Sequence, residues 1–258
     1  LAKSRFLDWP STPNEAGVEA GYRALLCWAL DDGAKLCDLL GEKGHAAKCN
    51  AIAGRLKKQI KQPNRLKQAA ALMAVAGLME PERACDEIIS VGGAKDFSTF
   101  YGYYMLQALA KAGEYQQALD IIRQYWGGML DLGATTFWED FNLDWSRNAA
   151  RLDDFVPEGK DDIHGDFGDY CYPGFRHSFC HGWASGPTPW MTRHVLGIEV
   201  LDAGCKTIRV NPHLGDLEWA EGTYPTPLGV IYVKHVKKDG GNVVSTVKAP
   251  DGIKVVSK

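Results

Sequence analysis

The 258-residue sequence lacks any apolar run near the 18 or so residues that a membrane-spanning helix needs. It also lacks an excess of one charge, because 29 basic residues stand against 32 acidic ones and give a formal net charge of −3. Neither sign gathers into a long run. The sequence therefore predicts neither a membrane protein nor a nucleic-acid-binding surface, and it favours neutral partners.

Spacings typical of metal, redox and phosphate sites are also missing. Five of the seven cysteines stand singly in apolar or helical surroundings, which indicates buried free thiols: Cys27, Cys37, Cys49, Cys85 and Cys205. Cys171 and Cys180 bracket an irregular, aromatic-rich stretch. Their role stays open between a disulfide and part of a pocket wall. No two of the seven histidines share a helix with a carboxylate at ligand spacing, and no GxSxG elbow or P-loop occurs. We therefore expect no metal and no cofactor.

Helical periodicity dominates the chain to about residue 128. Thr12-Pro13-Asn14-Glu15 predicts the start of a helix that runs to about Leu40, with the Thr12 hydroxyl as its cap. Further helices are expected at 45–61, 66–76, 81–91, 98–112 and 115–125. Their short connections predict about three helical hairpins in series, without a fixed-period repeat.

The last part of the chain changes to a period of two residues. Short β-branched segments separated by turn residues predict strands at 206–210, 217–223, 230–236, 243–247 and 253–256, after one more helix at 190–198. Strands joined in this way predict an antiparallel sheet or a small sandwich. The change of period near Cys205 predicts two domains, residues 1–204 and 205–258, so the expected fold class is mainly α with a C-terminal β module.

Residues 127–189 form a long stretch without periodicity, rich in glycine and tryptophan. Long irregular segments within a compact domain are usually functional or disordered, and the tryptophans argue against disorder. We therefore expect a functional site in this loop.

Glu139 and His181 are the residues of this loop best suited to chemistry. Glu139 lies among aromatic residues, where the ionised form of a carboxylate is disfavoured, so it is suited to proton transfer near neutral pH. A surface carboxylate and a hydrogen-bonded structural histidine are the alternative interpretations. Carboxylates beside tryptophans, without a cofactor, point to carbohydrate chemistry, and glycoside hydrolysis uses two carboxyl groups.

Several segments resemble a known family. GATTFWEDF (133–141), SFCHGWASGPTPW (178–190) and VNPHLGDLEWAEGTYPTPLG (210–229) are similar to the C-terminal half of the bacterial α-L-rhamnosidases of glycoside hydrolase family 78. FLDWP (6–10) and residues 103–130 are similar to the same family. The resemblance implies a partial (α/α)6 toroid followed by an antiparallel β-sandwich, and L-rhamnose-containing glycosides as substrates.

The resemblance also implies roles for particular residues. The family works by inversion, and the glutamate of its WE signature, which falls on Glu139, is the general base. The histidine of its CHGW signature lines the sugar pocket and falls on His181, with Trp138 and Trp183 around that pocket. A DW pattern at the pocket mouth falls on Asp8 and Trp9, for which a turn before the Thr12 cap is an equal alternative.

One departure from the family concerns the general acid. In the family it lies well N-terminal to the DW pattern, in a segment where an acidic residue is followed closely by a Leu-Gly-Trp or similar run and Gly-Asp, and no such run occurs here. We therefore expect a C-terminal fragment that holds the base, lacks the acid and is inactive or nearly so alone. Self-association through the uncovered half-toroid face, or an alternative closure of the helices, is expected too. Localisation stays open, since a signal peptide of a periplasmic or secreted parent would precede Leu1.

Two other functions stay open from the sequence. The first is a non-catalytic carbohydrate-binding or scaffold module, for which the acidic Glu139 would be unnecessary. The second is another toroid enzyme such as an unsaturated glucuronyl hydrolase, which needs basic residues to pair with a uronate carboxylate. Only Arg176 and His177 are candidates for that pairing in the loop.

Overall fold

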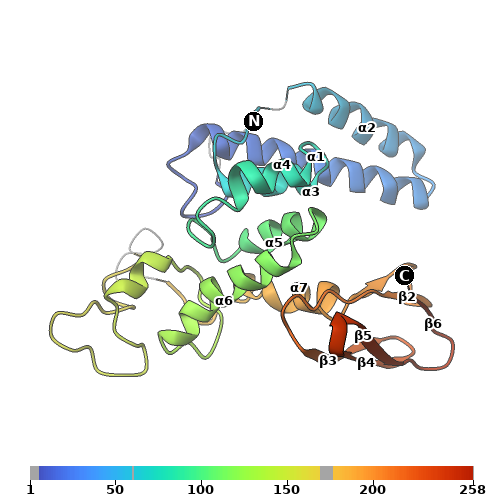
Figure 1. The fold of residues 1–258 in the computed structure, drawn as a ribbon. Coiled ribbons are helices and arrows are strands. Elements are labelled where there is room, and N and C mark those ends of the chain that lie inside the picture. Colours follow the sequence, from blue (N-terminus) through green and yellow to red (C-terminus); the bar gives the residue numbers. More distant parts are fainter. Residues whose placement is uncertain (1–5, 60, 169–176, 258) are drawn as a thin grey trace. The chain divides into compact units, whose positions relative to one another are not determined.

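A computed structural model describes residues 6–59, 61–168 and 177–257 (Figure 1). Contacts between residues divide the chain into two compact units. The first unit contains residues 1–113 and 121–185, and the second contains residues 114–120 and 186–258. Cys171 and Arg176, noted above, lie outside the described residues.

The first unit is built from helices at the predicted places. They are α1 (Glu15–Leu39), α2 (Lys43–Lys57), α3 (Lys67–Val75), α4 (Pro81–Ala84), which continues as the π-helical turn η1 (Cys85–Ile89), and α5 (Gly102–Lys111). The next helix, α6 (Tyr115–Asp131), contributes residues to both units. The predicted helices are thus confirmed, with ends that differ by several residues.

The start of α1 differs from the prediction. Asn14, not Thr12, caps this helix, because the Asn14 side-chain oxygen accepts a hydrogen bond from the Gly17 amide at 3.0 Å. The Thr12 hydroxyl donates instead to the backbone carbonyl of Asp8 at 3.0 Å. The predicted Thr12 cap is therefore wrong, because the Thr12 hydroxyl is hydrogen-bonded within a tight turn over residues 8–12 and does not cap the helix.

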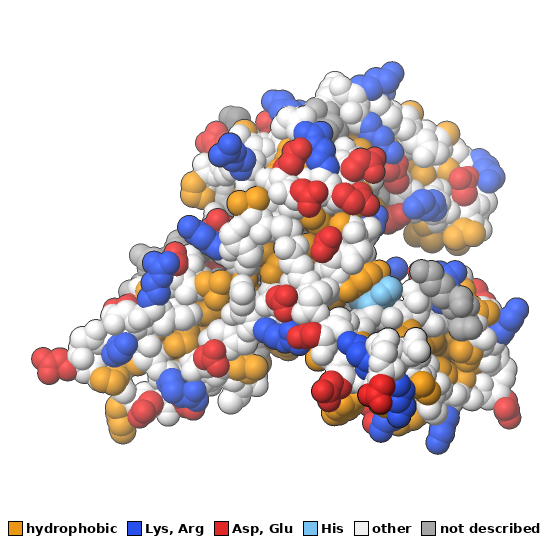
Figure 2. All heavy atoms as spheres, viewed as in Figure 1, with side chains coloured by type: hydrophobic (Ala, Val, Ile, Leu, Met, Phe, Trp, Pro, Cys, Tyr) orange, Lys and Arg blue, Asp and Glu red, His pale blue; other side chains and the backbone are white. Residues whose placement is uncertain are grey.

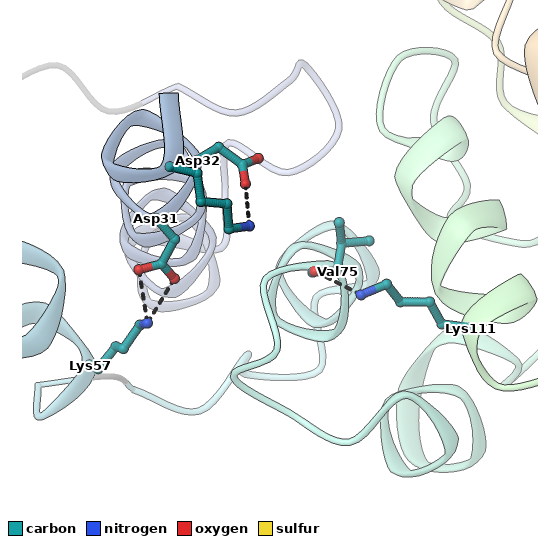
Figure 3. Close-up of polar contacts among 6 residues, drawn as sticks. Asp31, Asp32, Lys57, Val75 and Lys111 are labelled. Atoms are coloured by element: carbon teal, nitrogen blue, oxygen red, sulfur yellow. Dashed lines mark hydrogen bonds and ion pairs between the residues drawn. The ribbon is translucent and has the colours of Figure 1, made fainter. Parts of the chain in front are cut away.

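Small side chains bring the helices of the first unit together. α1 packs against α2 and α3, and α3 packs against α5. At Gly21 of α1 a Cβ atom would lie 3.4 Å from the Cα of Ala69 in α3 and 2.7 Å from the Leu7 side chain, so glycine permits this close approach. Figure 3 shows two polar links between helices: Lys57 of α2 pairs with Asp31 of α1 at 2.7 Å, and Lys111 of α5 donates to the Val75 carbonyl of α3 at 3.0 Å.

The predicted site loop is largely irregular, as expected, but shorter. Helix α6 continues to Asp131, so the irregular segment lies, among the described residues, at 132–168 and 177–186, with the short 3₁₀ turns η2 (Leu143–Arg147) and η3 (Gly182–Ala184). Helix α7 (Pro187–His194) follows it. The two glycines at 127 and 128 stay helical because the aromatic and aliphatic residues beside them are buried against the core.

The second unit contains two small sheets. Its strands are β1 (Ile198–Val200), β2 (Thr207–Val210), β3 (Trp219–Thr226), β4 (Gly229–Lys237), β5 (Val243–Lys248) and β6 (Lys254–Ser257), with the turn η4 (Asp239–Gly241) before β5. The orders are β1-β2-β6 and β3-β4-β5. All pairs are antiparallel except β2 with β6, which is parallel. Five strands are confirmed; β1 was not predicted, because the helix expected at 190–198 ends at His194, and Ile198 already belongs to the strand.

The core of the second unit joins both sheets. It contains Ile198, Ile208 and Val210 from one sheet and Ile231 and Val233 from the other. The fold class is thus confirmed: mainly α with a C-terminal β module, whose two sheets are mostly antiparallel.

The boundary predicted at residues 204 and 205 stays a prediction, and the contacts themselves divide the chain elsewhere. The start of α6 belongs with the β module, since the Tyr115 ring stacks on His213 with centroids 3.6 Å apart. The Asp216 amide also donates to the Gln116 side chain at 2.6 Å. A change of period in the sequence marks only where strands begin. Contacts between residues also place the first turns of α6 in the same unit as the strands.

Charged side chains of both signs are interspersed over the described part of the face in Figure 2. Within the described ranges, no helix is both long and apolar enough to cross a membrane.

Candidate functional site

Two segments of the irregular loop pair side by side in the first unit. The Glu139 amide donates to the Ser178 carbonyl at 2.8 Å, and the His181 amide donates to the Phe137 carbonyl at 2.7 Å. The Thr136 hydroxyl also donates to the Phe179 carbonyl. This strand-like pairing brings together the two motifs that the sequence separates by about forty residues.

Glu139 is a buried acid next to an accessible imidazole. Its side chain is 2% exposed, and its Oε2 atom accepts a hydrogen bond from the Ser178 amide at 2.9 Å. The Nδ1 atom of His181 lies 3.9 Å from the same oxygen, and the His181 side chain is 34% exposed. The structure therefore brings the predicted Glu139 and His181 together, with the histidine on the solvent side.

Trp183 completes this cluster. Its Nε1 atom donates to the backbone carbonyl of Glu139 at 2.7 Å, and its half-buried ring lies 4.7 Å from the His181 ring and 5.5 Å from the Phe100 ring. The hydrogen bond fixes the ring on the Glu139 segment. Glu139, His181 and Trp183 form what we call the acid cluster.

Trp138 lies elsewhere. Its side chain is fully buried, with ring centroids 5.1 Å from Phe179 and 5.9 Å from Phe141. It packs in the core beneath the paired segments, because consecutive residues of an extended segment point to opposite sides. Its predicted place around a sugar stays a prediction, and in this structure its ring has no exposed surface.

Asp8 and Trp9 lie in the tight turn before α1. The Asp8 carboxylate is buried, with Oδ1 accepting from the Ser11 amide at 3.1 Å and Oδ2 from the Ser98 hydroxyl at 2.5 Å. The half-buried Trp9 ring lies 4.9 Å from the Phe6 ring. Asp8 therefore has the turn position that the sequence left as an alternative, and its carboxylate is engaged inside the protein.

Sequence reasoning missed three buried polar residues of this region: Gln68, Ser98 and Thr99. Gln68 and Ser98 contact the Asp8 carboxylate, and the Thr99 hydroxyl donates to the Glu139 carbonyl at 2.5 Å. In the sequence Ser98 signals only the start of a helix. That signal was misleading, because α5 begins at Gly102 and leaves both hydroxyls free to bond to other segments.

His177 belongs to an aromatic cluster beside the paired segments. Its ring lies 5.0 Å from Phe179 and 5.6 Å from Trp145, and it is 5% exposed. Burial and, to a smaller extent, the charge of His164 lower the pKa of His177 to about 4. A hydrogen bond with the Phe167 backbone opposes this shift to a smaller extent. A histidine that is neutral at pH 7 supplies no positive charge for an ion pair with a uronate carboxylate, so that role in the glucuronyl hydrolase alternative is left to Arg176, which lies outside the described residues.

A cavity of about 850 Å³ also lies in the first unit, and none of the three acid-cluster residues lines it. Its walls include the N-termini of α1 and α3 and residues 140–143. Lys67 lines it as well, and its Nζ atom donates to the Gly93 carbonyl at 2.8 Å. Burial lowers the pKa of Lys67 to about 8, which the charge of Asp96 partly opposes.

Within the described residues, no group of three or more His, Cys, Asp or Glu side chains is arranged to hold a metal ion. The expectation that the protein uses neither metal nor cofactor stays a prediction.

Helical hairpins, an acid-bearing loop and a terminal β module are the parts expected of a helical-toroid glycoside hydrolase, and comparison with known proteins agrees. The family described as the bacterial α-L-rhamnosidase C-terminal domain matches residues 197–256. An α-L-rhamnosidase of Streptomyces avermitilis is 22% identical over 95% of this chain. The chain covers 24% of that relative, so it spans about a quarter of its length.

Solved structures of the same class share the fold. A family 78 rhamnosidase of Bacillus sp. GL1 has a TM-score of 0.71 at 23% identity, covering 94% of this chain and 26% of that one. An Aspergillus terreus α-L-rhamnosidase has a TM-score of 0.77 at 18% identity, covering 97% and 29%. The S. avermitilis enzyme complexed with L-rhamnose has a TM-score of 0.71 at 21% identity, covering 93% and 23%. These findings confirm the resemblance to the C-terminal part of an α-L-rhamnosidase.

Proposed function

We propose that this chain carries the base-bearing part of an α-L-rhamnosidase active site, with Glu139 as the general base of an inverting glycoside hydrolysis. The observation that carries the proposal is the acid cluster, in which a buried carboxylate lies 3.9 Å from a partly exposed imidazole. Both residues lie on the segments that resemble the family. A relative with the same fold was crystallised with L-rhamnose, which supports rhamnosides as the substrate class.

The arrangement suits this chemistry. In an inverting reaction the base takes a proton from water while the water oxygen attacks the anomeric carbon, and an acid protonates the leaving oxygen. The Ser178 amide holds Oε2 of Glu139 in one orientation. His181 and Trp183, on the open side of the cluster, offer a ring nitrogen and an aromatic surface to a sugar.

The proposal assigns no general acid to this chain. The family's acid-bearing segment, an acidic residue followed by a Leu-Gly-Trp or similar run, has no counterpart in the 258 residues, and the Asp8 carboxylate is engaged by Ser11 and Ser98. The chain alone should therefore bind the sugar but hydrolyse rhamnosides poorly.

Binding of L-rhamnose to the purified chain, followed by NMR titration, tests the sugar site. His181→Ala should weaken binding, whereas the same assay on Glu158→Gln, an exposed loop carboxylate, should not change. Shifts confined to the strands of the second unit would favour a carbohydrate-binding module. Absence of any saturable binding would contradict the proposal.

Hydrolysis of an aryl α-L-rhamnoside tests the missing acid. We expect turnover near the uncatalysed rate, with little further loss in Glu139→Gln. Robust turnover that Glu139→Gln abolishes would show that the chain contains its own acid and would overturn that part of the proposal.

A further inference from the structure

Ser98 and Thr99 are adjacent, hydroxyl-bearing and each 2% exposed, and they bond to two segments far apart in the sequence. Neither residue belongs to a helix or strand, since α5 starts at Gly102. Buried hydroxyls need partners, so the identity of those partners shows what the two residues do.

Ser98 holds the turn before α1. Its hydroxyl donates to Oδ2 of Asp8 at 2.5 Å, and the side-chain amide of Gln68 donates to the same oxygen at 3.3 Å. The Ser11 amide donates to Oδ1 at 3.1 Å. A buried carboxylate with donors to both oxygens is locked in place, and the turn carrying Trp9 is locked with it.

Thr99 holds the segment of the acid cluster. Its hydroxyl donates to the Glu139 carbonyl at 2.5 Å, and Nε1 of Trp183 donates to the same carbonyl at 2.7 Å. A carbonyl oxygen has two lone pairs, so these two donors satisfy it. Thr99 and Trp183 therefore hold the backbone of Glu139 through the same carbonyl oxygen.

We propose that Asp8, Ser98 and Thr99 form a positioning clamp that sets the Trp9 turn and the acid cluster in register with each other. Because Ser98 and Thr99 are neighbours in the chain, a displacement on one side is transmitted to the other. Asp8 is in this view a positioning residue. The clamp deepens the function proposed above, since it rests on Glu139 and Trp183 acting on a sugar.

The test uses the indole N–H resonance of Trp183 and the affinity for L-rhamnose, both measured on the full chain. Trp183→Phe assigns the resonance. Thr99→Val removes the donor at nearly constant volume, Thr99→Ser restores it, and Ser98→Ala releases the Asp8 side. Thr192→Val is the matched control, because the Thr192 hydroxyl of α7 also donates to a backbone carbonyl, at 3.1 Å, but this hydrogen bond is exposed.

We expect Thr99→Val to shift the Trp183 resonance and to weaken L-rhamnose binding about fivefold, the effect of losing one hydrogen bond. Thr99→Ser should restore both values, and Thr192→Val should change neither. Ser98→Ala should also shift the Trp183 resonance, although Ser98 does not bond to the acid cluster.

An unchanged resonance and affinity in Thr99→Val would overturn the clamp, and so would a Ser98→Ala spectrum identical to that of the wild type around Trp183. If the wild type binds no L-rhamnose, the proposed function fails, but the resonance needs no ligand and still decides the clamp. If Thr99→Val does not fold, the Ser98→Ala spectrum decides it.

Discussion

Protonation of His177 should destabilise the first unit in acid. An ordinary histidine has a pKa of 6.5, and burial lowers the pKa of His177 to about 4 in the folded protein. A folded pKa below the unfolded one means that the unfolded state binds the proton more readily. The resulting loss of stability begins as the pH falls through 6.5 and is complete below pH 4. At 1.36 kcal/mol per pH unit, the free energy of unfolding should fall by about 3 kcal/mol between pH 7 and pH 4.

Urea unfolding followed by tryptophan fluorescence at pH 7 and pH 4 measures this loss, because Trp145 lies beside His177. The variant His177→Phe keeps an aromatic ring in the cluster and removes the titration, so it should lose about 3 kcal/mol less than the wild type over this range. His45→Gln, at an exposed position of α2, is the control and should match the wild type. Equal pH dependence in the wild type and His177→Phe would refute the reasoning.

Three further predictions concern the helix cap of α1, two glycines of the second unit, and self-association. Asn14→Ala should lower the free energy of unfolding by about 1 kcal/mol and speed amide exchange in the first turn of α1, whereas Thr12→Ala should leave that exchange unchanged. Gly197→Ala should destabilise the second unit by more than about 2 kcal/mol in denaturant titrations, because its φ is +69° and the new Cβ would lie 2.2 Å from a backbone carbon. Gly204→Ala, at φ +83° with open space around it, should cost only about 1 kcal/mol. Light scattering should show concentration-dependent self-association that Leu39→Glu weakens, since this leucine is 85% exposed; a monomer at every concentration would contradict this.

The fold could be predicted largely from periodicity and stop signals. Glycine at position 41, with φ +78°, follows the end of α1 as the sequence indicated, because few other residues adopt that conformation readily. Helix α6 ran past its predicted end, because its last turns are held by burial, which a stop signal does not report. The parallel pairing of β2 with β6 joins strands far apart in the sequence, and short-range patterns do not encode such partners.

The site could be predicted only where residue type restricts function. Glu139, His181 and Trp183 could be named as candidates because an acid, an imidazole and an indole in one irregular loop suggest chemistry, and the structure brings these candidates together. Ser98 and Thr99 could not be found, since a hydroxyl near a predicted helix start has the same sequence signal whether it caps a helix or bonds to a distant segment. That difference depends on which segments the tertiary fold places beside it.

The acid cluster is held mainly through the backbone of Glu139. The Glu139 amide donates to Ser178, and its carbonyl accepts from Thr99 and Trp183, while only one hydrogen bond to the carboxylate, from Ser178, is found among the described residues. A base must be fixed in position yet keep lone pairs for the proton that it removes. The three hydrogen bonds to the Glu139 backbone fix its position and leave the lone pairs of the carboxylate available. For this reason a substitution at Thr99 should act on the position of the carboxylate, whereas Glu139→Gln removes the proposed base and leaves the backbone contacts in place.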